Sequence, residues 1–188
     1  MIKSENLIAG LLANGSVGVL PTDTIYGLVG SALRKDTVER IYALRRRNPK
    51  KPMIVLIAST GELKHFGVAP AAPAKRVLDK VWPGKVSVIL PCASKKFEYL
   101  HRGTKTLAFR VPASARLRAF LAKTGPLVAP SANIEGERPS RTIAEAKRYF
   151  GDGVEFYTHG RTSSAPSTLI NIDRKGEVTV LRQGAANI

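Results

Sequence analysis

Residues 43–57 read ALRRRNPKKPMIVLI and place five cations within seven residues, between the end of a predicted helix and a short apolar segment. Val38, Ile41 and Tyr42 repeat at the spacing of one helix face. Arg45 is the next position on that face, so we expect its side chain to point toward the interior. This stretch therefore predicts a buried positive charge where a helix meets a strand.

Two features bound this stretch and leave two interpretations open. Asn48 and Pro49 are predicted to end the helix, because proline has no backbone N–H to donate and restricts the residue before it. Residues 53–57 then form an apolar run typical of a strand buried on both faces. The arginines either complement the dipole at the C-terminus of a helix or form a site for an anion.

Composition limits the class of protein. The 188 residues are 44% hydrophobic, enough for one domain over residues 1–188 that buries its own core. The formal charge of +16 favours nucleic acids, nucleotides or anionic membranes as partners. The single cysteine, Cys92, excludes an internal disulfide and a zinc site made of cysteines, and fits a reducing cytosol.

The N-terminal segment resembles the apolar part of a signal peptide, but its pattern favours an amphipathic helix. Glu5 and Asn6 interrupt its start, and Ser4 is a suitable N-cap. No apolar run approaches the ~18 residues needed to span a bilayer. We therefore expect a soluble, cytoplasmic protein without membrane contact.

Helical and strand patterns alternate along the chain. Besides the segments above, strands are expected at 17–20, 86–90, 106–111, 127–129, 155–157, 168–172 and 177–181, and helices at 60–66, 70–81, 116–123 and 142–150. The last two strands are predicted to form a hairpin. This order predicts an α/β fold, a twisted mixed sheet with flanking helices.

The strand at 106–111, TLAFRV, carries a charge inside an apolar segment. Alternation places Thr106, Ala108 and Arg110 on one face and the apolar residues on the other. Burying a guanidinium costs free energy unless an anion accompanies it. Arg110 is expected either to pair with an internal acid such as Asp23 or to face a ligand.

Polar residues also follow strands elsewhere. The segment 21–33 is expected to be a loop that presents the hydroxyls of Thr22, Thr24 and Tyr26 and the carboxylate of Asp23. The loop after residue 129 presents Ser131 and Asn133. The connection at 93–105 is expected to be irregular and basic. Its histidine and the two others are expected to be solvated.

Familiar catalytic motifs are absent from the sequence. It holds no G-x-x-x-x-G-K-[ST], G-x-G-x-x-G, H-E-x-x-H or G-x-S-x-G pattern. What remains suits phosphate positioning and charge neutralisation better than covalent catalysis. These cations and polar groups lie near strand ends: Thr22, Arg45, Arg47, Lys51, Arg110, Ser131, Asn133, Ser167 and Arg182.

Seven ordered blocks resemble the YrdC-like threonylcarbamoyl-AMP synthases along nearly the whole chain. They are PTDTIYGL, RRRNPKKPMIVLI, WPGKVSVIL, LAFRVP, PSAN, APSTLI and VLRQG. The resemblance, to the short single-domain form, implies a twisted α/β fold with a concave basic cleft. It also implies the condensation of L-threonine, bicarbonate and ATP to threonylcarbamoyl-AMP and pyrophosphate, for tRNA threonylcarbamoyladenosine modification.

The resemblance also implies roles for individual residues. The Lys-x-Arg signature of the family falls on Arg45 and Arg47, with arginine in place of the lysine, and Lys51 is the next cation; these three are the catalytic candidates. The implied ATP contacts are Arg45, Arg47, Thr106, Ser131, Asn133, Ser140 and Arg182. The implied threonine contacts are Thr22, Tyr26, Arg110 and Ser167. Mg²⁺ is implied with ATP, and no direct protein ligand for a metal is assigned.

The implied partners are tRNA or double-stranded RNA, and a downstream complex that transfers the threonylcarbamoyl group to tRNA. An alternative from another class is an RNA-binding module that uses the basic cleft without making an adenylate. The charge of +16 and the scarcity of aromatic residues fit such a shape-and-phosphate binder.

Overall fold

One nine-stranded mixed sheet runs through the computed structural model, which describes residues 4–163 and 165–188. The strand order is β7-β1-β2-β6-β3-β5-β4-β8-β9. Three neighbouring pairs, β1–β7, β3–β5 and β4–β8, are parallel, and the other pairs are antiparallel. The strands are β1 (Gly18–Pro21), β2 (Tyr26–Ser31), β3 (Ile54–Leu56), β4 (Val86–Pro91), β5 (Thr106–Arg110), β6 (Leu127–Val128), β7 (Phe156–Tyr157), β8 (Thr168–Ile172) and β9 (Val178–Arg182). The predicted α/β fold with a mixed sheet is confirmed.

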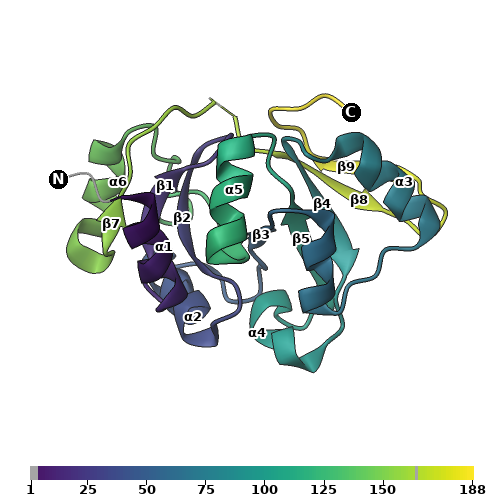
Figure 1. The fold of residues 1–188 in the computed structure, drawn as a ribbon, viewed down its shortest axis with the longest axis horizontal. Helices are drawn as coiled ribbons and strands as arrows, with labels where there is room; N and C mark the ends of the chain where they lie inside the picture. Colours follow the sequence, from purple (N-terminus) through teal and green to yellow (C-terminus); the bar gives the residue numbers. More distant parts are fainter. Residues whose placement is uncertain (1–3, 164) are drawn as a thin grey trace.

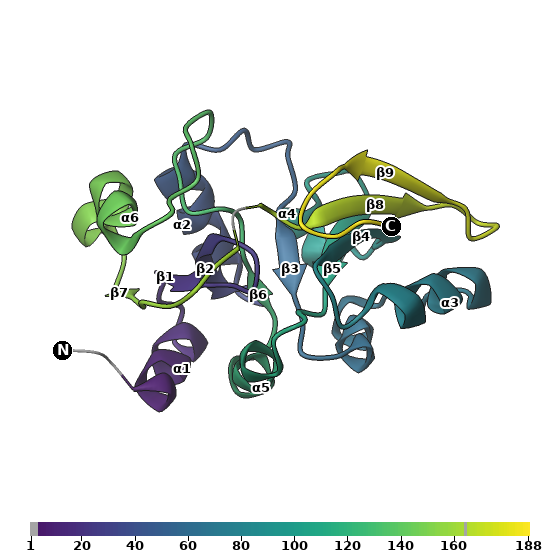
Figure 2. The same ribbon diagram turned by 90° about the horizontal axis from the view of Figure 1, so that it is seen from above.

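Helices flank this sheet on both sides (Figures 1 and 2). They are α1 (Glu5–Ala13), α2 (Lys35–Arg45), α3 (Ala72–Val81), α4 (Glu98–His101), α5 (Ala115–Thr124) and α6 (Ile143–Phe150), with 3₁₀ turns at Thr60–Phe66, Lys95–Phe97 and Gly151–Gly153. Helices α1 and α5 lie together on one side of β1, β2 and β6, and α2 lies on the other side (Figure 2). The described residues contain no helix that is long and apolar enough to cross a membrane.

Alternate strand residues feed two hydrophobic clusters, one on each side of the sheet. On β3, Val55 packs in the larger cluster, beneath α2, whereas Leu56 packs in the smaller one, beneath α1 and α5. Val128 and Leu127 on β6 divide in the same way. Because successive side chains point to opposite faces, this division shows that the centre of the sheet is buried on both sides.

Helix termini follow their local sequence. Ser4 caps α1 as predicted, and Thr142 caps α6; their side chains accept hydrogen bonds from Leu7 N and Glu145 N, respectively. Helix α2 ends earlier than the predicted stop at Asn48 and Pro49. Arg46 adopts a left-handed conformation (φ 49°) directly after Arg45, so the helix stops before the proline is reached.

Two segments predicted to be irregular are ordered. Residues 26–31 form strand β2, which pairs with β1 and is buried throughout, so the predicted loop at 21–33 shrinks to the turn between these strands. The connection at 93–105 contains α4, and His101 is buried rather than solvated. Its ring nitrogens contact Ser94 O and Gly103 N, which compensates the loss of water.

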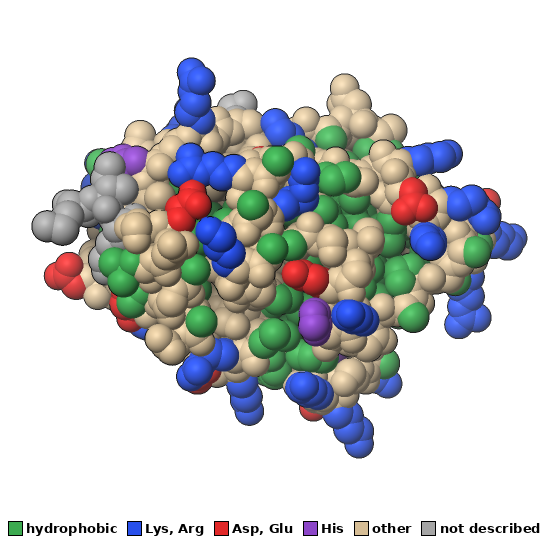
Figure 3. Space-filling model, viewed as in Figure 1, with side chains coloured by type: hydrophobic (Ala, Val, Ile, Leu, Met, Phe, Trp, Pro, Cys, Tyr) green, Lys and Arg blue, Asp and Glu red, His purple; other side chains and the backbone are tan. Residues whose placement is uncertain are grey.

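Charge is spread widely over the face seen in Figure 3. Lysine and arginine side chains lie around its rim and between apolar side chains, and few acidic side chains accompany them. This distribution gives that face no single cationic patch. A closer grouping of arginines lies in a pocket over the sheet.

Candidate functional site

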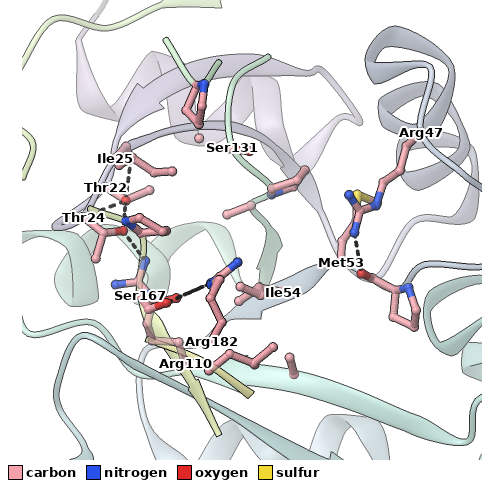
Figure 4. A pocket seen from close by; sticks show the side chains of 18 of the residues that line it. Thr22, Thr24, Ile25, Arg47, Met53, Ile54, Arg110, Ser131, Ser167 and Arg182 are labelled. Carbon is pink, nitrogen blue, oxygen red and sulfur yellow. Dashed lines mark hydrogen bonds between the residues drawn. The ribbon is translucent and has the colours of Figure 1, made fainter. Parts of the chain in front are cut away.

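A pocket of about 490 Å³ opens over the sheet where β3, β5, β4 and β8 lie side by side (Figure 4). The strand register supplies its floor, because Ile54 on β3 is opposite Ala108 on β5, which is opposite Ile89 on β4. These three side chains line the pocket. The face of β5 that was predicted to carry Thr106, Ala108 and Arg110 is therefore the face that meets the pocket.

Loops and the ends of helices and strands surround this apolar floor with polar side chains. They come from the β1–β2 turn, the end of α2, the segment after β6, the segment before β8 and the end of β9. The described lining residues include four arginines and no aspartate or glutamate. The polar and charged side chains of the lining are Thr22, Thr24, Tyr26, Arg45, Arg47, Thr104, Thr106, Arg110, Ser131, Ser167 and Arg182.

Arg110 lies at one end of the pocket with an acidic partner. It is 3% exposed, and its Nη1 forms a salt bridge with Asp23, whose side chain is 7% exposed. Its Nη2 donates to Thr24 Oγ1 at 3.4 Å, whereas its Nε is buried without a partner among the described residues. The predicted pairing with Asp23 is confirmed, and Arg110 also lines the pocket, so the prediction that it faces a ligand stays open.

The same end of the pocket contains Ser167 and Arg182 (Figure 4). The buried Ser167 hydroxyl is 2.8 Å from Ser87 Oγ, and Arg182 Nη2 donates to Ser167 O at 2.8 Å. Burial and the charge of Arg110 lower the pKa of Arg182. This end therefore carries two guanidinium groups with one carboxylate in contact, which leaves a net positive charge of about one.

Arg45 lies on another wall and has neutral partners. It is 3% exposed, as its place on the inner face of α2 predicted. Its Nε donates to Asn133 O at 3.0 Å, and its Nη2 lies 3.2 Å from Ser131 Oγ and 3.3 Å from Asn133 Oδ1. Nη1 is buried with no partner among the described residues. Burial, together with the charge of Arg47, lowers the pKa of Arg45 to about 10, so the group stays charged at neutral pH.

Arg47 and Lys51 take different positions although both follow α2. Arg47 lines the pocket and donates to Lys51 O and Pro52 O, which orders the segment after the helix (Figure 4). Lys51 Nζ lies 3.1 Å from Glu135 Oε1, and its side chain is 61% exposed. Glu135 also accepts a hydrogen bond from Asn48 N, and its own N–H donates to Arg45 O. Glu135 therefore joins the segment after α2 to the loop that carries Ser131 and Asn133.

The pocket gathers most of the residues predicted from the sequence. Lining it are Thr22, Tyr26, Arg45, Arg47, Thr106, Arg110, Ser131, Ser167 and Arg182. Asn133 and Ser140 lie buried behind the wall: Asn133 Nδ2 donates to two backbone carbonyls, and Ser140 Oγ donates to Ala132 O. Lys51 is outside the lining.

Two contributors were given no role in the site from the sequence. Thr24 was expected among the hydroxyl residues of the 21–33 loop, but its hydrogen bond with Arg110 was not predicted. Glu135 follows Asn133 closely in a polar loop, but nothing in the sequence indicated its contacts with residues near position 50. The described residues contain no group of three or more His, Cys, Asp or Glu side chains that could hold a metal ion.

Comparisons with known proteins agree on one family. The family model Sua5_yciO_yrdC, described as Telomere recombination, matches residues 10–184. A threonylcarbamoyl-AMP synthase from Bacillus subtilis is 35% identical over 147 residues, which are 77% of this chain and 42% of that protein. One from Halorhodospira halophila is 32% identical and is covered to 81% of both lengths.

A solved structure gives the same result for the fold. The crystal structure of P. abyssi Sua5 complexed with L-threonine superposes with a TM-score of 0.86 at 28% identity. The match covers 96% of this chain and 54% of that one. This chain thus spans about half the length of the Bacillus and Pyrococcus relatives and most of the length of the Halorhodospira relative.

Proposed function

The chain belongs to the Sua5–YciO–YrdC family, and we propose that it is an L-threonylcarbamoyladenylate synthase, a nucleotidyltransferase that condenses L-threonine, bicarbonate and ATP. The observation that carries this proposal is the pocket lined by four arginines without an acid among its described lining residues. Two of these arginines are buried, and each holds an N–H without a partner. Buried guanidinium N–H groups without an acceptor favour an anionic ligand, because the ligand supplies the missing acceptor.

The Arg110 end is assigned to L-threonine. The Thr22 and Ser167 hydroxyls offer hydrogen bonds that suit the amino and hydroxyl groups of threonine, and the Arg110 Nε and the nearby Arg182 suit its carboxylate. Tyr26 lies in the adjacent wall and donates from its hydroxyl to Gly160 O, so it shapes this end. The threonine complex of P. abyssi Sua5 supports an amino acid site in this fold.

The Arg45 and Arg47 end is assigned to the triphosphate of ATP. Arg47 and the unpaired Nη1 of Arg45 would neutralise phosphate oxygens, and Ser131 and Thr106 would orient the nucleotide. Arg182, which lies at the Arg110 end beside Ser167, would contact the nucleotide at the α-phosphate, next to the bound threonine. Asn133 and Ser140 would support the wall, and Lys51 would reach a phosphate only by leaving Glu135.

The proposed reaction needs positioning rather than a nucleophilic side chain. The amine of threonine takes up bicarbonate and loses water to form a carbamate. A carbamate oxygen then attacks the α-phosphorus of ATP in line, the bond to the β-phosphate oxygen breaks, and pyrophosphate leaves. The pocket contributes by holding three reactants together and by offsetting charge on the leaving group with Arg45 and Arg47.

Mg²⁺ is proposed as a companion of ATP. The lining offers no carboxylate cluster among its described residues, so the ion would be held by phosphate oxygens and water, as is common for Mg²⁺ in nucleotide sites. When bound, it would supply further neutralisation of phosphate charge. None of the roles given to the side chains above depends on it.

The proposed product would be consumed by a downstream complex that modifies tRNA in the cytoplasm, and tRNA or double-stranded RNA affinity is proposed for the basic surface. A purely RNA-binding role is less well supported. Arg45 and Arg110 are each 3% exposed, so they are placed for a small ligand inside the pocket rather than for the phosphates of an RNA helix.

The test is release of pyrophosphate by the purified protein. With ATP, Mg²⁺ and bicarbonate, release should require L-threonine and should yield threonylcarbamoyl-AMP, detected by mass spectrometry. The Arg110→Met variant should lose most of this release, and the exposed Lys64→Met variant should keep it. Release that is independent of threonine, or the absence of release, would reject the proposed activity.

A further inference from the structure

Arg45 occupies the position where the family signature has a lysine. Its guanidinium makes contacts through two nitrogen atoms, whereas a lysine ammonium has only one nitrogen. Nε contacts the backbone oxygen of Asn133, while Nη2 contacts the side chains of Ser131 and Asn133. A guanidinium presents these N–H groups in a fixed plane, whereas the lysine ammonium places all of its donors on one atom. The contacts therefore depend on the shape of arginine as well as on its charge.

The segment that Arg45 contacts, residues 131–133, is also held by hydrogen bonds with the residues that follow it. Asn133 Nδ2 donates to Ile134 O at 2.7 Å and to Glu137 O at 2.9 Å, which fixes the turn that follows. Ser140 N and Oγ both donate to Ala132 O. The Ser131 hydroxyl is the part of this segment that lines the pocket, and its hydrogen-bond partner on α2 is Arg45.

From these contacts we propose that Arg45 is a positioning residue, which sets the Ser131 hydroxyl and the adjacent backbone at the nucleotide wall by bridging α2 to residues 131–133. This inference rests on the proposed function and deepens it. Arg45 then acts on the nucleotide mainly through the wall that it holds, and Arg47 carries the larger part of direct charge neutralisation. The remaining N–H, on Nη1, is the group through which Arg45 itself can meet the ligand.

A double-mutant cycle on ligand affinity separates positioning from direct contact. The variants are Arg45→Lys, Ser131→Ala and the double variant, with the exposed Arg46→Lys as the matched control for an arginine-to-lysine change. Arg45→Lys should weaken ATP binding by about tenfold, and adding Ser131→Ala should weaken it little further, because the hydroxyl has already lost its position. Arg46→Lys should leave the affinity unchanged.

Two results would overturn the proposal. If the effects of Arg45→Lys and Ser131→Ala multiply, Arg45 acts on the ligand independently of Ser131. If Arg45→Lys lowers the midpoint of urea unfolding but leaves the ATP affinity of the folded protein intact, the arginine is merely structural. Calorimetry well below the unfolding temperature measures the affinity of folded protein alone.

A second probe keeps this test distinct from the test of the synthase activity. If the wild type binds inorganic triphosphate but neither binds ATP nor releases pyrophosphate, the proposed activity is wrong, and the same cycle measured with triphosphate still decides the role of Arg45. If the wild type binds neither, both proposals fail. Unfolding measurements on Arg45→Lys and Asn133→Ala should show about tenfold coupling in the unfolding constant, and additive effects would contradict the bridge.

Discussion

Arg110 and Arg45 are the same residue type, are equally buried at 3% exposure and line the same pocket, yet their surroundings differ in charge. Arg110 forms a salt bridge with Asp23. Among the described residues, the hydrogen-bond partners of Arg45 are neutral oxygens. Because a buried charge without a counter-ion costs free energy, the Arg45 wall gains more from an anionic ligand than Arg110 does.

This difference divides the pocket into two parts with separate tasks. At the Arg110 end, the salt bridge with Asp23 holds the guanidinium in place before any ligand binds. The Arg45 and Arg47 end keeps a net positive charge, because Glu135, the carboxylate whose charge acts on both arginines, makes its hydrogen bonds to Asn48 N and Lys51. Burial, together with the charge of Arg47, lowers the pKa of Arg45 to about 10. The comparison teaches that an internal acid stabilises Arg110 in the fold, whereas the direct contacts of Arg45 are neutral oxygens, so the proposed ligand would supply its first contacting counter-charge.

Removing Asp23 should have the largest effect on stability. Asp23→Asn leaves Arg110 buried without a counter-ion, which we expect to cost about 3 kcal/mol in the free energy of unfolding. The control is Asp36→Asn, because Asp36 forms its salt bridge with Arg34 at the exposed start of α2 and should contribute little. Urea unfolding of both variants checks this, and equal losses would show that the Arg110 pair is no more important than a surface pair.

The directions of the Arg110 and Arg45 side chains could be predicted from the sequence. The alternation in residues 106–111 placed Arg110 on the face of β5 that meets the pocket, and the stripe from Val38 to Tyr42 placed Arg45 inside. These predictions succeeded because the repeat of a strand or helix fixes the direction of a side chain.

Other features depended on contacts between distant segments. Residues 26–31 looked like a loop because glycines and hydroxyl residues surround them, but pairing with β1 and β6 makes them a strand. His101 is buried because α4 forms in a segment that appeared only basic and irregular by composition. The bridge from Arg45 to Asn133 joins positions 88 residues apart, and local patterns carry no information about it.

At the Arg45 and Arg47 end, Arg47→Ala should have the largest effect on the KM for ATP. We expect the KM for ATP to rise by about tenfold, corresponding to the loss of one charge-assisted contact. The KM for threonine should change little, because Figure 4 places Arg47 on the side of the pocket away from Arg110 and Ser167. Initial rates of pyrophosphate release at varied ATP and at varied threonine measure both constants, and equal rises in the two would contradict a divided pocket.

Ser167→Ala should give the reverse pattern, with a smaller effect. The variant removes a hydroxyl at the Arg110 end, and we expect the KM for threonine to rise by about fivefold, the scale of one neutral hydrogen bond. Ser163→Ala is a control, because Ser163 Oγ donates to Thr24 O and Ala165 O and its side chain is not among the lining residues. The same rate measurements apply, and a selective rise in the KM for ATP would reassign Ser167 to the nucleotide.

Glu135→Gln should have the smallest effect on the free energy of unfolding. The pH dependence of that effect shows whether the carboxylate charge causes it. The hydrogen bond from Asn48 N and the contact with Lys51 lower the pKa of Glu135 below its ordinary value of 4.5. Its stabilisation, about 0.5 kcal/mol, is therefore complete above pH 4.5 and is lost as the pH falls through the lowered pKa. The free energies of unfolding of wild type and variant, measured with urea, should differ at pH 7 and converge as the pH falls below 4.5, whereas a constant difference would exclude the carboxylate charge as the cause.

The central claim is that one pocket binds ATP at its Arg45 and Arg47 end and L-threonine at its Arg110 end. Calorimetric titration of ATP with and without saturating L-threonine tests it most directly, with D-threonine as the control. We predict that L-threonine tightens ATP binding several-fold, that ATP tightens threonine binding by the same factor, and that D-threonine has no such effect. Identical ATP affinities with and without L-threonine, or mutual exclusion of the two ligands, would contradict the account.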